Sequence, residues 1–146
     1  MVLDPIIEGY RLTRVLMDGG SGLTLIYEDT VRRMGIDPSR IKQSNTTFEG
    51  VIPGVKAYSR GSVVLEVTFG SPGNSRSEEL LFIIAPFQND YHALLGRTAF
   101  ARFNILPHYG YLTLKMPGPR GVITVSGITE RSSRAEEHAT ALAAGL

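Results

Sequence analysis

The sequence predicts an all-β domain with one or two short helices. Short apolar segments rich in valine, isoleucine and leucine alternate with turns that contain glycine and proline, which is the pattern of strands and hairpins. The chain has 146 residues, 42% of them hydrophobic, and can therefore bury one core. Because the sequence contains no internal repeat, we expect a single lobe.

The first predicted elements lead to an acidic residue. Residues 10–17 alternate apolar and polar side chains and then become continuously apolar, which predicts a strand that enters the core and ends at Asp18. Residues 23–27 are expected to form the return strand. Asp29 or Thr30 can then cap a single helical turn, which Gly35 is suited to end.

A hairpin is expected in the middle of the chain. Residues 62–69 have clear strand composition, and residues 80–84 form an apolar segment that is typical of a buried strand. Residues 70–77 between them have the composition of a mobile turn.

The last elements are expected to complete the domain. Residues 97–103 can form a short helix, and residues 111–116 and 122–125 are predicted to be strands joined by a Pro-Gly-Pro turn. The final segment is polar and then rich in alanine, which suits a flexible or weakly helical tail or linker. We therefore expect one domain at residues 1–126 and a tail at residues 127–146.

The most informative motif is VLMDGGS at residues 15–21. A short apolar strand that ends in an acid and two glycines presents the Asp18 carboxylate on a tight loop, because glycine adopts backbone angles that other residues avoid. Ser21 is expected to donate its hydroxyl proton to that carboxylate. The distant segment ALLG at residues 93–96 can pack behind the loop and hold it in place.

These segments together resemble the active-site half of a retropepsin-like aspartic protease. The likeness is nearest to the protease segment of gypsy-type LTR retrotransposon gag-pol polyproteins, particularly those of plants. It is carried by RLTRVLMDGGSG at residues 11–22, YHALLGR at residues 91–97 and LKMPGPRGVITV at residues 114–125. With the strands between them, these segments extend the resemblance over roughly residues 5–126.

The resemblance implies a closed β-barrel of the single-lobe acid protease type, and an aspartic endopeptidase that cleaves a retroelement polyprotein. Such chemistry needs two carboxylates about 3 Å apart that share one proton, so that one activates water and the other donates to the scissile carbonyl. One chain supplies only Asp18, so the second carboxylate is expected from Asp18 of a second copy in a C2 homodimer. The polypeptide substrate is expected to bind as an extended strand. Coupled acids imply an acidic to mildly acidic pH optimum.

The resemblance also assigns three groups of residues around Asp18. These are the active-site loop (Gly19, Gly20 and Ser21), the supporting apolar-apolar-Gly segment (Leu94, Leu95, Gly96 and Arg97), and a substrate-binding flap at residues 46–58 (Phe48, Gly50, Val51, Ile52 and Gly54). It implies no cofactor and no metal. The implied setting is intracellular, in the cytoplasm within retroelement particles.

Two positions depart from the family pattern. The family has Thr or Ser after the catalytic Asp, with a hydroxyl that hydrogen-bonds across the dimer, whereas this chain has Gly19. Each such bond contributes about 1 kcal/mol, and its loss supports a second interpretation, a catalytically degenerate domain that serves as a structural or dimerisation module. In many relatives an acid at the position of Gly22 pairs with the arginine at position 97, so Arg97 is expected to pair with Asp90 or to remain at the surface.

Other interpretations of the loop have less support. A run of Asp, Gly and Ser is most often a surface turn, but the preceding strand and the later LLGR segment favour a site. The glycines suggest a phosphate loop, although no Lys-Ser/Thr pair follows them. A Ser-His-Asp triad with Ser21 fits by residue type but lacks the Gly-x-Ser-x-Gly pattern. His92, His108 and His138 are too dispersed for a metal site, and we expect His92 to be a hydrogen-bonded packing residue.

The composition argues against several classes of function. The formal net charge is +1 and the basic residues are scattered, so direct binding to nucleic acid or to a membrane is not expected. The absence of cysteine excludes disulfides, thiol catalysis and thiolate zinc sites, and it is compatible with an intracellular setting. The N-terminus does not have the pattern of a signal peptide, and no apolar stretch approaches the ~20 residues of a membrane-spanning helix.

Overall fold

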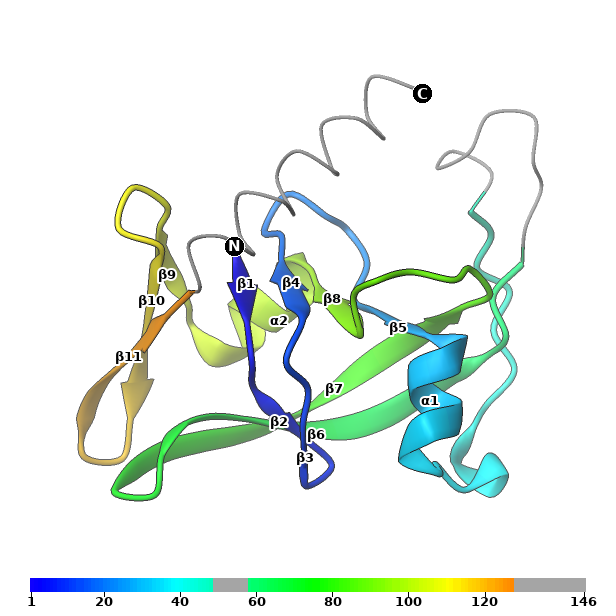
Figure 1. The fold of residues 1–146 in the computed structure, drawn as a ribbon, viewed down its shortest axis with the longest axis horizontal. Helices are drawn as coiled ribbons and strands as arrows, with labels where there is room; N and C mark the ends of the chain where they lie inside the picture. Colours follow the sequence, from blue (N-terminus) through cyan, green and yellow to red (C-terminus); the bar gives the residue numbers. More distant parts are fainter. Residues whose placement is uncertain (49–57, 128–146) are drawn as a thin grey trace.

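The computed structural model describes residues 1–48 and 58–127, and strands outnumber helices in both ranges (Figure 1). The first part contains β1 (Val2–Leu3), β2 (Ile6–Ile7), β3 (Tyr10–Arg11), β4 (Val15–Met17), β5 (Leu25–Tyr27), α1 (Glu28–Met34) and a 3₁₀ turn (Pro38–Arg40). The second part contains β6 (Ser62–Ser71), β7 (Asn74–Ala85), β8 (Ala93–Leu95), α2 (Arg97–Phe103), β9 (Leu106–His108), β10 (Thr113–Gly118) and β11 (Gly121–Ser126). The predicted all-β class with two short helices is confirmed.

The strands form two sheets. The larger sheet curls into a half-barrel with the order β1-β4-β8-β5-β7-β6-β2-β3, and the smaller has the order β11-β10-β9 (Figure 1). The smaller sheet stands beside the turn end of the β6–β7 hairpin, and it contributes Leu114, Met116 and Ile123 to the main core. Both sheets and both helices therefore share one hydrophobic core.

The position of β8 matters most for the site. β8 pairs in parallel with β4, where Leu94 lies opposite Leu16, and antiparallel with β5, where Leu94 lies opposite Leu25. Since β8 separates the strands before and after Asp18, the loop between β4 and β5 must cross the end of β8. Figure 1 shows this loop in blue, above the end of β4.

The predicted hairpin is confirmed, but the predicted mobile turn over residues 70–77 is wrong. β6 and β7 stay paired from Ser62 and Ile83 to Ser71 and Asn74, and only residues 72–73 form the turn. Gly70 makes this possible, because its φ of 105° and the closeness of the Asn74 carbonyl oxygen, 2.3 Å from a Cβ at position 70, exclude a side chain. Strand pairing therefore overrides the turn-like composition.

The predicted single strand over residues 10–17 is also wrong, because the chain leaves one edge of the larger sheet and rejoins the sheet one strand in from the opposite edge. β3 ends at Arg11 as the partner of β2, and β4 begins at Val15 beside β1 and β8. Glu8 and Gly9, with φ of 49° and 81°, make the tight turn between β2 and β3. The two-residue strands β1 and β2 are too short to show a periodicity in sequence.

α2 has the predicted extent, whereas α1 is longer than the predicted single turn and has a different N-cap. α1 begins at Glu28 with Tyr27 at the N-cap position, so the predicted cap at Asp29 or Thr30 is wrong. Asp29 pairs with Arg32 instead, with an oxygen–nitrogen distance of 2.9 Å. Gly35 ends α1 in the left-handed conformation, as predicted. No helix in the described residues is long and apolar enough to cross a membrane.

Candidate active site

Asp18 stands at the end of β4, where the chain leaves the core. Its backbone N–H donates to the Leu95 carbonyl at 2.9 Å, which joins the start of the loop to the end of β8. Its own carbonyl accepts from the Ser21 N–H at 3.1 Å, which closes a tight turn. The half-buried carboxylate accepts from the Gly20 N–H at 3.0 Å, so a backbone donor of the same loop orients the acid.

The Ser21 hydroxyl does not donate to the Asp18 carboxylate, so that expectation is wrong. Its hydroxyl donates to the Leu23 carbonyl at 3.0 Å and accepts from the Leu23 N–H at 3.3 Å. A serine hydroxyl readily forms such bonds with the backbone two residues away. Nor does it belong to a catalytic triad in the described residues, since both of its bonds are to backbone and the Nδ1 of His92 accepts from the Arg14 N–H.

Gly96 lies directly under the loop, at the end of β8. A Cβ at this position would stand 2.3 Å from the Leu23 carbonyl oxygen and 2.7 Å from the Ser21 carbonyl oxygen. Its φ of −96° is open to any residue, so glycine is required here by close approach and not by backbone angle. The Arg97 N–H then donates to the Ser21 carbonyl at 2.8 Å. The segment of residues 94–97 therefore lies against the loop, with the Leu95 side chain in the core.

The hydroxyls of Thr24 and Thr98 continue this support. The Gly96 N–H donates to the Oγ1 of Thr24 at 3.1 Å, and the Thr24 and Thr98 hydroxyls are 3.0 Å apart. Only 3% of Thr24 is exposed. Neither threonine is among the predicted site residues, although a threonine inside the apolar return strand indicates a buried hydroxyl that needs a partner.

The far side of the loop faces α2. The three atoms nearest to a Cβ at Gly19 all belong to the ring of Phe100, at 3.3 to 3.6 Å. At Gly20 the nearest atom is the Oδ1 of Asp18, at 3.3 Å. Phe100 is not among the predicted site residues, because it lies beside the Asp18 loop in space but far from it in the sequence.

Arg97 remains exposed, the second of its two expected outcomes. Within the described residues its guanidinium makes no ion pair, and it lies 3.5 Å from the position of a Cβ on Gly22. The expected pairing with Asp90 is not formed. The backbone carbonyl of Asp90 accepts instead from the guanidinium of Arg14.

The predicted flap falls largely outside the described residues. Gly50, Val51, Ile52 and Gly54 lie in the range 49–57, which the structure does not describe. On either side of that range, Thr47 bridges antiparallel to Tyr58, so the two ends of the segment lie side by side. Phe48 is 2% exposed, and its ring packs edge-on against Phe87 with 5.3 Å between centroids.

His92 is a hydrogen-bonded packing residue, as predicted. Its Nδ1 accepts from the Arg14 N–H at 3.2 Å, and its backbone N–H donates to the Arg14 carbonyl at 2.8 Å. Burial lowers the pKa of His92 below its ordinary 6.5, and the positive charges of Arg14 and Arg33 lower it further. The folded state therefore favours the neutral form of the His92 imidazole.

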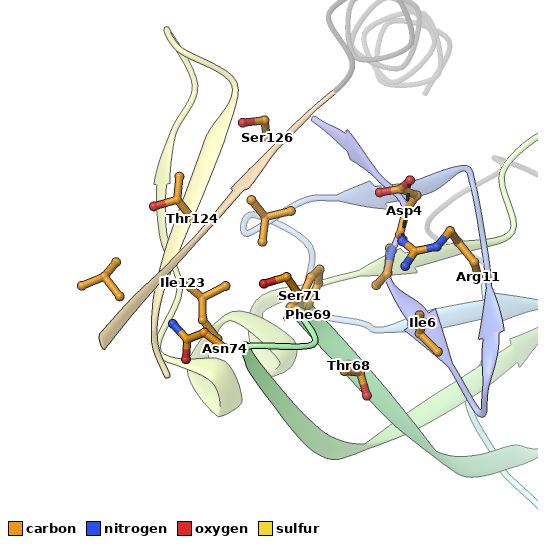
Figure 2. Close-up of a pocket in the computed structure, with 14 residues that line it drawn as sticks. Asp4, Ile6, Arg11, Thr68, Phe69, Ser71, Asn74, Ile123, Thr124 and Ser126 are labelled. Carbon is orange, nitrogen blue, oxygen red and sulfur yellow. Dashed lines mark hydrogen bonds and ion pairs between the residues drawn. The ribbon is translucent and has the colours of Figure 1, made fainter. Parts of the chain in front are cut away.

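A pocket of about 370 Å³ lies elsewhere, between β11 of the smaller sheet and strands β2, β3 and β6 of the larger sheet (Figure 2). Asp4, Arg11, Thr68 and Asn74 are among the residues that line it. None of the residues assigned to the candidate site lines this pocket, so it is separate from Asp18. Over residues 1–48 and 58–127, no three His, Asp or Glu side chains are grouped to hold a metal ion.

No protein-family model and no curated protein matches this chain. It is similar to a solved structure, the retroviral protease-like domain of Ddi1 from Leishmania major, with a TM-score of 0.58 and 15% identity over 88% of this chain and 93% of that one. The fold is retropepsin-like. A second retropepsin-like structure, an aspartic protease from Rickettsia conorii, matches with a TM-score of 0.55 and 12% identity over 84% of this chain and 79% of that one.

Proposed function

We propose that the chain is an aspartic endopeptidase that uses Asp18 as its acid and base. The observation that carries the proposal is the setting of the Asp18 carboxylate, at the outer end of β4 in a retropepsin-like fold. The carboxylate is held by the Gly20 N–H, and its loop is fixed to the end of β8 by the Leu95 carbonyl. A carboxylate that is both oriented and accessible suits proton transfer to and from water.

The second carboxylate comes from Asp18 of a second copy. A single lobe supplies one such acid, and the reaction needs two that share a proton about 3 Å apart. In a C2 homodimer the two loops meet at the symmetry axis, where one Asp18 activates water and the other donates to the scissile carbonyl. The substrate is a polypeptide in extended conformation, and the likeness in sequence to retrotransposon proteases favours a retroelement polyprotein.

The glycine at position 19 does not exclude this activity. The hydrogen bonds that hold the loop come from the backbones of Asp18, Gly20, Ser21 and Arg97 and from the Ser21 hydroxyl. None of them needs a side chain at position 19. A degenerate domain that only dimerises is therefore the weaker candidate.

Cleavage of a diverse peptide pool at pH 4 to 6 tests the proposal. We expect the wild type to cleave, and Asp18→Asn to lose at least about 100-fold of the rate, because an amide cannot exchange the proton. Asp90→Asn is the matched control, an exposed acid whose carboxylate makes no bond in the described residues. A statine-type transition-state analogue should block the wild type.

Two outcomes would argue against a protease. Cleavage that persists in Asp18→Asn would assign it to a contaminant or to another residue. A folded dimer that cleaves nothing over this pH range would favour the structural module.

A further inference from the structure

We propose that Phe100 is a positioning residue for Asp18, and that its ring occupies the space next to the loop that a side chain at position 19 would otherwise fill. The inference rests on the proposed function, because it concerns how the same loop is kept in a reactive geometry. The pair formed by Gly19 and Phe100 carries it. The three described atoms nearest to a Cβ at position 19 all belong to the Phe100 ring.

The backbone of Gly19 does not itself demand glycine. Its φ lies outside the left-handed range in which side chains are strained. What limits position 19 is the ring, with Cε2, Cδ2 and Cζ of Phe100 at 3.3, 3.4 and 3.6 Å from a Cβ there. A distance of 3.3 Å is tighter than most carbon contacts, so even alanine would press on the ring. The small residue and the large one are therefore complementary in shape.

Phe100 is held firmly enough to support the loop. It lies in the middle of α2, its N–H donates to the Gly96 carbonyl at 3.2 Å, and its carbonyl accepts from the Ile105 N–H at 2.9 Å. Its partly buried side chain packs against the main core. The ring thus joins the core on one side to the Asp18 loop on the other.

Gly19 needs such a contact because nothing else in the described residues fixes it. Neither its N–H nor its carbonyl makes a hydrogen bond within residues 1–48 and 58–127. The bonds of the loop hold Asp18 before it and Gly20 and Ser21 after it. The carboxylate of Asp18 depends on the Gly20 N–H, so movement of Gly19 would displace the donor that orients the acid.

The first arm of the test removes the ring. Phe100→Ala is expected to lower kcat by about 10- to 100-fold with little change in KM, since a small misplacement of a catalytic group has this effect. Phe100→Leu, which keeps much of the volume, should recover most of the rate. Ile36→Ala is the matched control, because Ile36 is another partly buried side chain packed against the same core. It should lower stability without lowering kcat.

The second arm fills the space instead. Gly19→Thr restores the residue type that the family carries. Alone, it is expected to lower kcat, because the Phe100 ring leaves no room for the threonine side chain. Adding Phe100→Ala to Gly19→Thr should raise kcat above that of either single variant, the sign of a coupled pair. Additive losses in the double variant would overturn the proposal.

Amide hydrogen exchange separates this inference from the proposed function. In Phe100→Ala the amides of residues 18–21 should exchange at least about tenfold faster, while those of β6 and β7 stay protected. If the wild type cleaves nothing but this exchange result holds, the protease proposal fails and the supporting contact stands. If kcat, pH profile and exchange in Phe100→Ala match those of Ile36→Ala, Phe100 is an ordinary core residue and the inference is wrong.

Discussion

Gly96 sets how closely the Asp18 loop can approach the end of β8. Two carbonyl oxygens of the loop lie within 2.7 Å of where its Cβ would be, and both belong to backbone that cannot rotate away. Thr24 satisfies the Gly96 N–H at the same place. The glycine at position 96 and the buried Thr24 hydroxyl therefore set the distance between the Asp18 loop and the end of β8.

Gly96→Ala is expected to lower the free energy of unfolding by about 1–3 kcal/mol, because the methyl group would overpack this contact. The same substitution should reduce any cleavage, since the loop must shift. Gly73→Ala in the β6–β7 turn is the control: nothing lies within 4 Å of a Cβ there, and its effect should stay within about 0.5 kcal/mol. Urea denaturation measures both. Equal midpoints would contradict the close approach.

Thr24→Val should cost about 1–3 kcal/mol of stability, because it leaves the buried Gly96 N–H without an acceptor. Thr98→Val removes only the hydroxyl pair, since Thr24 still accepts from Gly96. It should therefore cost less. Thermal unfolding of the two variants decides the order, and a larger loss in Thr98→Val would show that the acceptor role of Thr24 is unimportant.

At the scale of residues, the sequence predicts a position well where the residue type and its neighbours allow only one placement. The placement of Asp18 after a strand and of the LLG segment behind it could be predicted, because an acid between an apolar strand and two glycines has to leave the core. The partners of Thr24 and Phe100 could not be predicted, since they lie far along the chain: the hydroxyl bonds of Thr24 span 72 and 74 residues. The bond of Ser21 was mispredicted because two acceptors competed for one hydroxyl.

At the scale of elements, α2 is attached to the long hairpin by Arg76. This side chain comes from β7, is 22% exposed, and donates to the carbonyls of Phe103 at 2.8 Å and Arg102 at 3.0 Å. These carbonyls lie at the C-terminal end of the helix, where unpaired acceptors and the helix dipole favour a cation. Glu78 holds the guanidinium from the other side at 3.1 Å. The helix that carries Phe100 is thus anchored at both ends.

Arg76→Gln should lower the free energy of unfolding by about 1.5–3 kcal/mol, the range for hydrogen bonds to a charged group. Arg102→Gln is the matched control, because Arg102 meets the same Glu78 at 3.2 Å but is 58% exposed. A surface ion pair of this kind contributes about 0.2–1 kcal/mol. Chemical denaturation of both variants is the measurement, and equal losses would mean that the helix end does not need Arg76.

Helices and strands were predictable where an apolar pattern is long or where a glycine marks the end of the element. The β6–β7 hairpin, α2 and the end of α1 at Gly35 follow from apolar runs and a glycine cap. β1, β2 and β9, with two or three residues each, carry no periodicity, and their partners alone define them. The extent of the hairpin was underestimated because Gly70 and the polar residues after it have the composition of a turn.

For the whole molecule, the free energy of unfolding should fall at acid pH because His92 becomes protonated. The folded state lowers the pKa of this imidazole, so its stabilising contribution is complete above the ordinary value of 6.5 and is lost as pH falls through the lowered pKa. His92→Asn, whose amide oxygen can accept from Arg14, should show a smaller loss of stability between pH 7 and pH 5. His108→Asn, which replaces an exposed acceptor of the Tyr111 N–H, should behave as the wild type. Unfolding midpoints across this range decide it, and identical pH dependence in all three proteins would rule out the role of His92.

The oligomeric state is the second expectation at this scale. The proposed reaction needs Asp18 from two chains, so we expect a dimer at micromolar concentration. Sedimentation velocity of the wild type and of Asp18→Asn measures it. A permanent monomer would remove the second carboxylate and the protease proposal with it.

Because β8 lies between β4 and β5 but follows both in the sequence, the order of synthesis decides when the Asp18 loop gains its support. A ribosome releases Asp18 long before it releases Gly96, and domains fold as units once their parts have emerged. Until β8 and α2 are outside the exit tunnel, the nascent chain has its acid but neither the Leu95 carbonyl nor the Phe100 ring that hold the acid's loop. The geometry of the Asp18 loop is therefore completed only late in synthesis, because the acid is made first and the residues that support it are made later.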